Sequence, residues 1–285
     1  MADPLEGLGP GTDELEDLLR VALRAAAAGA DVLRGRDAAQ LHAQNKSSDG
    51  DWVTAFDVAA EDAVSTVLRE ERPYDVITGE ESGTFVPEHR SGLRWSVDPL
   101  DGTTNFIRDI VYYATSVAVC DESGNWLAGV VDAPALGRVY YAVAGLGAWV
   151  RRSGADSRLT GPVSGRRGAL YGTGFSYDAA VRREQFGGFL DTMERFSDMR
   201  RLGAASLDLC MVADGTLDGY SERALHEHDW AAGALIASEA GAGVERPDLP
   251  PPPALRDTSH STSVAEAHDY EKARLASVIA AWARP

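Results

Sequence analysis

The spacing of hydrophobic residues predicts two helices early in the chain. An acidic capping-box pattern at residues 13–16 is followed by leucines and alanines at helical intervals over residues 15–26. A second helix is predicted in AEDAVSTVL, which follows Asp57, a residue suited to capping a helix. Runs at 74–78 and 93–97 predict short strands. This part of the chain therefore mixes helices and strands.

Between residues 111 and 150 the pattern changes to long β-rich runs. VYYATSVAVC, NWLAGVVDAP and RVYYAVAGLGAWV are separated by the turn-forming segments DESG and ALG, which predicts an antiparallel meander. Residues 153–167 are polar and glycine-rich, and we interpret them as a join between two halves. The predicted organisation is an N-terminal α+β half over residues 1–152 and a C-terminal α/β half over residues 153–285.

In the second half, strand and helix patterns alternate. The predicted elements are a strand in ALYGTGF, helices at 181–196 and 204–213, a strand in LDGY, a helix in WAAGALIASEAG, a strand near Val244, a strand in TSVAEA and a final helix to Trp282. Such alternation implies a sheet between helices, as in α/β proteins.

Composition narrows the class of protein. Hydrophobic residues make up 44% and charged residues 25% of the 285 residues, as in ordinary soluble proteins. The formal charge of −17 argues against nucleic acid as a partner, because phosphate backbones are bound by basic surfaces. We expect Cys120 and Cys210, in apolar surroundings, to be buried small hydrophobes. No signal-peptide pattern or apolar run of about 18 residues is present, so we expect a cytoplasmic protein that does not enter a membrane.

The stretch WSVDPLDGTTNF, at residues 95–106, contains the strongest candidate chemistry. Asp98 and Asp101 are placed in one turn at the end of a half-buried strand, where two carboxylates can share the oxygen-preferring ion Mg²⁺. Gly102 and the threonines after it would open a helix or turn whose backbone N–H groups face a phosphate. Taken alone, however, DPLDG is more often a solvated turn.

The same stretch resembles the signature of the inositol monophosphatase family, which are magnesium-dependent, lithium-sensitive phosphomonoesterases. Three other segments agree with the family in order, namely DWVTAFD from Asp51, GEES from Gly79 and HDWAAGALIASEAGA from His228. The resemblance runs from about Lys46 to Ala242. It implies a layered αβαβα sandwich of the sugar-phosphatase type.

The resemblance also implies a set of site residues. One magnesium would be held by Glu80, Asp98 and the backbone carbonyl of Leu100, and a second by Asp98, Asp101 and Asp229, so that most metal ligands lie in the N-terminal half. Two or three Mg²⁺ ions are expected per site, with Mn²⁺ as a substitute. Water activated by the metal and oriented by Asp51 and Thr103 would attack phosphorus. The residues expected to contact substrate are Gly102, Thr103, Ala205 and Glu222.

Each of these assignments has a plainer alternative. Asp229 immediately precedes a predicted helix and could be its N-cap, and Glu222 could be an exposed acid. The segment 203–206 could supply backbone contacts to substrate, or it could be a tight helix entry. His228 stands where the family usually has tryptophan, and it is either part of the wall of the substrate mouth or a surface histidine.

The predicted function is magnesium-dependent hydrolysis of a small phosphorylated metabolite, most like that of an inositol-1-monophosphatase, by a homodimer. Fructose 1,6-bisphosphate, histidinol phosphate and nucleotide 3′-phosphates are alternative substrates for the same chemistry. An aspartyl-nucleophile phosphatase is a rival, but such enzymes carry a D-x-D pair, whereas this chain has D-x-x-D. A rival of another class is a protein that binds the transcription machinery.

Overall fold

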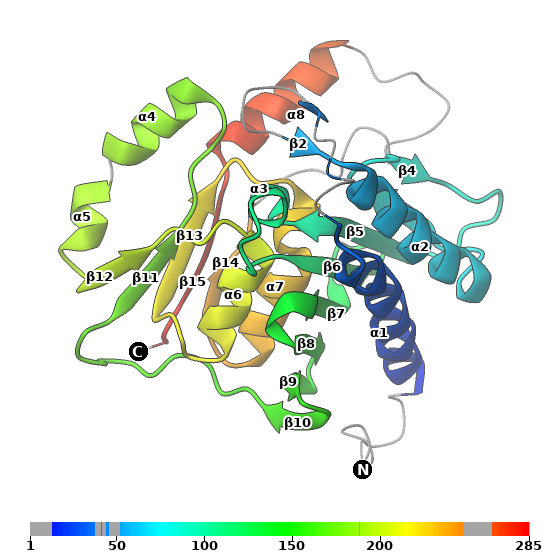
Figure 1. The fold of residues 1–285 in the computed structure, drawn as a ribbon, viewed down its shortest axis with the longest axis horizontal. Coiled ribbons are helices and arrows are strands. Elements are labelled where there is room, and N and C mark those ends of the chain that lie inside the picture. Colours follow the sequence, from blue (N-terminus) through cyan, green and yellow to red (C-terminus); the bar gives the residue numbers. More distant parts are fainter. Residues whose placement is uncertain are drawn as a thin grey trace.

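The computed structural model describes residues 13–37, 41, 44–45, 52–187, 189–247 and 264–284, and their elements form five layers (Figure 1). The outer helices α1 (Asp13–Arg34) and α2 (Ala55–Glu71) cover one face of a large sheet. Helices α6 (Ala205–Ala213) and α7 (Glu227–Glu239) separate this sheet from a smaller one. Helices α4 (Ala179–Gly187) and α5 (Phe189–Met193) lie outside the smaller sheet. The predicted αβαβα sandwich is confirmed.

The large sheet has eight strands among the described residues. Their order is β10 (Ala155–Arg158), β9 (Gly147–Arg152), β8 (Arg138–Val143), β7 (Trp126–Ala133), β6 (Ala114–Cys120), β5 (Arg94–Asp101), β3 (Val76–Gly79) and β4 (Thr84–Phe85). Strands β5 to β10 pair antiparallel in succession, which confirms the predicted meander. Strand β3 instead runs parallel to β5, with Gly79 opposite Val97. The carboxyl ends of β3 and β5 therefore meet at one edge of the sheet.

The small sheet has five described strands, and one of them corrects the prediction. The order is β12 (Asp198–Arg200), β11 (Leu170–Thr173), β13 (Gly219–Arg223), β15 (Val278–Trp282) and β14 (Gly243–Glu245). The predicted final helix is present but ends at Ala276, and its extension to Trp282 is wrong, because VIAAW forms β15 and pairs antiparallel with both β13 and β14. A short apolar run suits either a helix or a strand, and here the two neighbouring strands supply its backbone partners.

Other boundaries also differ from the prediction. Helix α8 spans Val264–Ala276 and includes the part of TSVAEA that was predicted as strand, while Thr262 and Ser263 lie outside the described residues. The predicted helix at 181–196 is two shorter helices, α4 and α5, and strand β12 after them was not predicted. The smaller elements are β1 (Gln44–Asn45), β2 (Trp52–Val53), α3 (Thr103–Ile107) and the 3₁₀ turn η2 (Pro134–Leu136).

The two predicted halves share a core. Strand β10 follows residue 152 but still belongs to the large sheet. One buried hydrophobic cluster contains Tyr140 and Val150 of that sheet together with Leu209 of α6 and Tyr220 of the small sheet. Cys120 and Cys210 are buried and unbridged, as expected. None of the described helices is long and apolar enough to cross a membrane.

Gly29 of α1 gives a test of this packing. A β-carbon built at Gly29 would lie 2.8 Å from Cγ2 of both Val64 and Thr115, so α1 packs directly on α2 and β6 there. Gly29→Ala should lower the free energy of unfolding by about 1–3 kcal/mol, because the overlap outweighs alanine's better helix propensity. The matched control is Gly187→Ala in α4, where a β-carbon meets nothing within 4 Å. Denaturant unfolding measures both, and a Gly29→Ala protein as stable as wild type would contradict the packing.

Candidate active site

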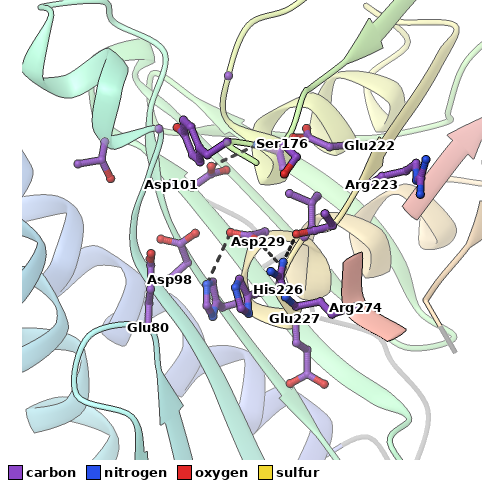
Figure 2. A pocket seen from close by; sticks show the side chains of 18 of the residues that line it. Glu80, Asp98, Asp101, Ser176, Glu222, Arg223, His226, Glu227, Asp229 and Arg274 are labelled. Carbon is purple, nitrogen blue, oxygen red and sulfur yellow. Dashed lines mark hydrogen bonds and ion pairs between the residues drawn. The ribbon is translucent and has the colours of Figure 1, made fainter. Parts of the chain in front are cut away.

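A cavity of 710 Å³ opens where the carboxyl ends of β3 and β5 meet the N-terminal ends of α3, α6 and α7. Figure 2 shows that Asp98 and Asp101 of β5, Glu80 after β3 and Asp229 of α7 turn toward it, with Glu222 on the far wall. The other predicted site residues that line it are Leu100, Gly102, Thr103 and Ala205. All of the predicted site residues except Asp51 therefore share one cavity. Asp51 lies outside the described residues, so its assignment stays a prediction.

The turn that carries Asp98 and Asp101 is buried. Asp98 is only 1% exposed and Asp101 only 7% exposed, so the alternative of a solvated turn is wrong. One carboxylate oxygen of Asp98 accepts a hydrogen bond from the Leu100 N–H at 3.0 Å, which fixes the side chain within the turn. Gly102 then has φ 94°, and a β-carbon there would lie 2.9 Å from the Tyr112 carbonyl oxygen. Glycine is therefore required where the chain leaves the strand and opens α3 at Thr103.

Asp101 is held by the start of helix α6. Its carboxylate accepts hydrogen bonds from the backbone N–H groups of Ala205 at 3.2 Å and Ser206 at 2.8 Å, and from the Ser206 hydroxyl at 2.5 Å. These donors are groups that a helix leaves without partners in its first turn. The Ala205 N–H, predicted to contact substrate, is thus directed at Asp101, while the Ala205 residue still borders the cavity.

Glu80 follows β3, and the turn that contains it is fixed by α2. Both carboxylate oxygens of Glu61 accept backbone hydrogen bonds, from Glu81 at 2.8 Å and from Ser82 at 2.7 Å. Gly79 lies so close to this carboxylate that an added β-carbon would be 2.4 Å from a Glu61 oxygen. Glu61, which is not among the predicted site residues, thus positions the turn that contains Glu80.

Asp229 is the third residue of helix α7 and not its N-cap. The helix begins at Glu227 with His226 as N-cap, and the Asp229 carboxylate accepts a hydrogen bond from the His226 N–H at 2.6 Å. The interpretation of Asp229 as the N-cap is therefore wrong, and His228 lies on the first turn of the helix, where it borders the cavity. Arg94 of β5 pairs with Glu227, which ties this end of α7 to the large sheet.

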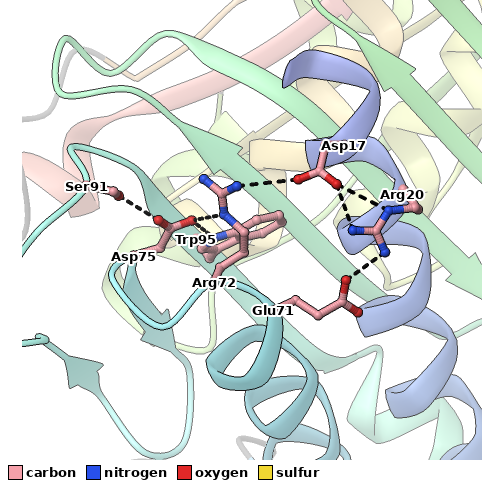
Figure 3. A network of polar contacts seen from close by, with 7 residues as sticks. All are labelled: Asp17, Arg20, Glu71, Arg72, Asp75, Ser91 and Trp95. Atoms are coloured by element: carbon pink, nitrogen blue, oxygen red, sulfur yellow. Dashed lines mark hydrogen bonds and ion pairs between the residues drawn. The ribbon is translucent and has the colours of Figure 1, made fainter. Parts of the chain in front are cut away.

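At the amino ends of β3 and β5, away from the cavity, a polar network holds the two strands (Figure 3). Asp75, only 1% exposed, accepts hydrogen bonds from Ser91 at 2.6 Å, and from Arg72 and the Trp95 indole at 2.8 Å each. Arg72 also reaches Asp17 of α1 at 3.4 Å. Because Asp75 immediately precedes β3 and Trp95 belongs to β5, this buried carboxylate joins both strands to the outer helices.

The Thr103 hydroxyl contacts a carboxylate that the sequence analysis treated only as a helix cap. Asp57 is the third residue of α2 and completes a capping box with Thr54, which is the N-cap, so the prediction that Asp57 itself precedes and caps this helix is wrong. Its other oxygen lies 3.1 Å from the Thr103 hydroxyl, which is also 3.0 Å from the Leu100 carbonyl oxygen. Asp57 and Glu61 are four residues apart in the sequence, a spacing that places both side chains on one face of helix α2.

Burial and mutual repulsion make the acids of the cavity hard to ionise. Burial, and then the charges of Glu80 and Asp101, raise the pKa of Asp98 well above its usual value. Burial raises the pKa of Asp101 to about 7 despite its hydrogen bonds from Ser206, and it raises the pKa of Glu222 to about 7. Burial also raises the pKa of Asp229. An oxygen-rich cluster with these properties fits divalent cations, whose charge would stabilise the ionised carboxylates.

Basic side chains that were not among the predicted site residues also border the cavity. They are Arg201, Arg223 and Arg274, contributed by separate parts of the chain. No motif predicts them, because Arg201 follows β12, Arg223 ends β13 and Arg274 belongs to α8, which are distant from one another in the sequence. Their cations are suited to binding an anion next to a cluster of acids.

Comparison with known proteins is consistent with this geometry. The sequence pattern of the inositol monophosphatase family matches residues 14–282. The chain belongs to this family. An inositol-1-monophosphatase of Mycobacterium leprae is 42% identical over 206 residues, which covers 71% of this chain and 70% of that protein. A protein of Pasteurella multocida named Nus factor SuhB is 36% identical over 232 residues, which covers 80% and 84% respectively.

Solved structures of other family members have the same fold. The extragenic suppressor protein suhB from Bartonella henselae matches with a TM-score of 0.76 at 29% identity, over 94% of each chain. The Mycobacterium tuberculosis protein SuhB matches with a TM-score of 0.73 at 34% identity, over 95% of this chain and 92% of the other. The layered arrangement of this chain is thus that of the inositol monophosphatase family.

The raised pKa values predict how the stability of the metal-free protein depends on pH. The folded-state pKa of Asp101 and of Glu222 is about 7, above the ordinary 3.8 and 4.5, so the folded state binds these protons more tightly than the unfolded chain. Their contribution to stability is present below about pH 4 and is lost as the pH rises to about 7. The loss should be at most about 3–4 kcal/mol for each of the two carboxyl groups, since one pKa unit corresponds to about 1.4 kcal/mol.

Denaturant unfolding of wild type and of the double variant Asp101→Asn/Glu222→Gln measures this contribution. At about pH 7.5 the variant should be more stable relative to wild type than it is at about pH 5. A difference between the two proteins that does not change with pH would contradict the assigned pKa values.

Proposed function

We propose that this family member is a magnesium-dependent phosphate monoester hydrolase, most similar in activity to the inositol-1-monophosphatases among its relatives. The observation that carries this proposal is the convergence of Glu80, Asp98, Asp101 and Asp229 on a cavity that is also bordered by arginines. The cytoplasmic location and the homodimer remain parts of the proposal.

The metal ligands are the groups that the resemblance implied. Glu80, Asp98 and the Leu100 carbonyl would hold one Mg²⁺, and Asp98, Asp101 and Asp229 would hold a second, with Mn²⁺ as a substitute. Bound magnesium would supply positive charge to the phosphate and lower the pKa of a nucleophilic water. The backbone bonds to Asp101 and the capping bond to Asp229 hold these side chains before any metal binds.

Thr103 and Asp57 are suited to orient the attacking water. When the Thr103 hydroxyl donates its proton to Asp57, the lone pairs of Oγ1 are available to accept a hydrogen from a water in the cavity. The water's oxygen then retains a lone pair for attack on phosphorus. Asp51, assigned to this position from the sequence, remains a second candidate.

The substrate is proposed to be a small phosphorylated metabolite. A cavity of 710 Å³ accommodates a molecule of that size, and arginines beside the acids favour an anion. Glu222 receives a hydrogen bond from the Tyr220 hydroxyl at 2.7 Å, which orients the carboxylate as an acceptor for substrate hydroxyl groups. Inositol monophosphate leads the candidates, and fructose 1,6-bisphosphate, histidinol phosphate and nucleotide 3′-phosphates are the alternatives.

The experiment that tests the function is phosphate release from these four substrate classes with Mg²⁺, before and after chelation. Activity should disappear on chelation and return with Mg²⁺ or Mn²⁺. Asp98→Asn should lower kcat by about a thousandfold, because it removes a charge that both metals share. The matched control is Asp62→Asn on the exposed side of α2, which should behave as wild type. Full activity after exhaustive chelation would refute the mechanism.

The pair of Asp57 and Thr103 is tested by a double-mutant cycle. Asp57→Asn and Thr103→Val should each lower kcat by about a hundredfold, the lower range for proton-handling groups. The double variant should lose little more, because the two residues act as a unit. Thr103→Ser, which keeps the hydroxyl, should retain most activity. Additive losses would show that the two side chains act independently.

A second function is suggested by relatives named Nus factor SuhB, which are 34–38% identical to this chain. The alternative is that this chain binds a protein of the transcription machinery. The Asp98→Asn variant separates the two functions, since it should abolish hydrolysis but leave an interaction surface intact.

A further inference from the structure

His228 faces the acids of the cavity from the opposite side. It lies on the first turn of α7, whereas Glu80 follows β3 and Asp98 lies on β5. One ring nitrogen of His228 and one carboxylate oxygen of each acid all lie within 4.8 Å of one another. These separations are close to what one cation requires, because ligands about 2.0–2.2 Å from an ion lie at most about 4.4 Å apart, and small rotations of the side chains would bring all three atoms onto it.

The His228 ring is held in this orientation. It stacks on the His226 ring with the ring centres 5.3 Å apart and the planes at 11°. Its Nε2 atom lies 3.6 Å from a carboxylate oxygen of Asp229, and the side chain is only 13% exposed. Because its neighbours restrict the ring, binding a cation would cost little side-chain entropy.

Two buried hydroxyl groups at the floor of the cavity give an independent indication. The Ser96 hydroxyl, on a residue only 2% exposed, and the Thr78 hydroxyl have no hydrogen-bond partner among the described residues. Ser96 and Thr78 are opposite each other on β5 and β3, two positions before Asp98 and Glu80, so all four side chains share one face of the sheet. Buried hydroxyls without partners are costly, and a hydrated ion at this position would supply partners for them.

We propose that His228 binds, through a ring nitrogen, the cation held by Glu80 and Asp98, and that it shifts the preference of this site from Mg²⁺ toward Mn²⁺. Imidazole is a good ligand for transition metals, whereas Mg²⁺ prefers sites made of oxygen atoms. The proposal rests on the proposed function, because it concerns the same metal site. It makes His228, which stands where the family usually has tryptophan, a determinant of metal specificity.

The direct test is electron spin echo spectroscopy of the Mn²⁺-loaded protein, which detects nitrogen bound to the metal. Wild type should show ¹⁴N coupling. His228→Phe, which keeps a flat ring but removes both nitrogens, should lose the coupling. It should also bind Mn²⁺ at least about tenfold more weakly, with a smaller change for Mg²⁺. His89→Phe makes the same substitution at an exposed position away from the cavity and should match wild type.

The outcomes separate this inference from the proposed function. Mn²⁺ binding without ¹⁴N coupling in wild type overturns the inference, as does coupling that persists in His228→Phe and must then come from another residue such as His226. If His228→Phe does not fold, the wild-type spectrum and the Mn²⁺ affinity of His228→Asn decide. Phosphatase activity without nitrogen coupling supports the proposed function and overturns the role of His228. Nitrogen coupling without hydrolysis of any tested substrate supports the role of His228 and contradicts the proposed function.

Discussion

The constraint on which this structure depends is the burial of several carboxylates around one cavity. Burial and mutual repulsion raise the pKa of Asp98, Asp101 and Asp229, so the cluster is unfavourable without compensating positive charge. A fold can keep such a cluster only if the surrounding structure fixes each member. The layers around the cavity fix each carboxylate in this way. Their packing contributes stability that offsets the unfavourable free energy of the buried acids.

Each acid is held by a different kind of local structure. Parallel pairing of β3 with β5 brings Glu80 beside Asp98, and the backbone of α6 fixes Asp101. The capping box of α7 fixes Asp229, and Arg94 ties that helix to the sheet. No single element makes the site, so a displacement of one layer would separate the acids.

The cavity has two further features besides its acids. Two histidines stack at the start of α7, and one of them faces Glu80 and Asp98. Arginines from three segments border the same space. The arrangement combines a cluster that favours cations with a rim that favours anions, which is the charge pattern needed to bring a metal and a phosphate together.

The sequence by itself determined the class of fold, the meander, the helices α1, α2, α6 and α7, and nearly all of the acids at the cavity, because these depend on local periodicity and on motifs within short stretches. The tertiary structure decided what depends on contacts between distant segments. Trp282 ends a strand because β13 and β14 lie on either side of it, and Asp57 reaches Thr103 because α2 packs against the end of β5. Asp229 is held inside α7 and not at its cap, since helix boundaries depend on the preceding loop. The arginines at the rim and the position of His228 opposite Glu80 arise only when the layers close around the cavity, because no local pattern encodes a distance between residues on different elements.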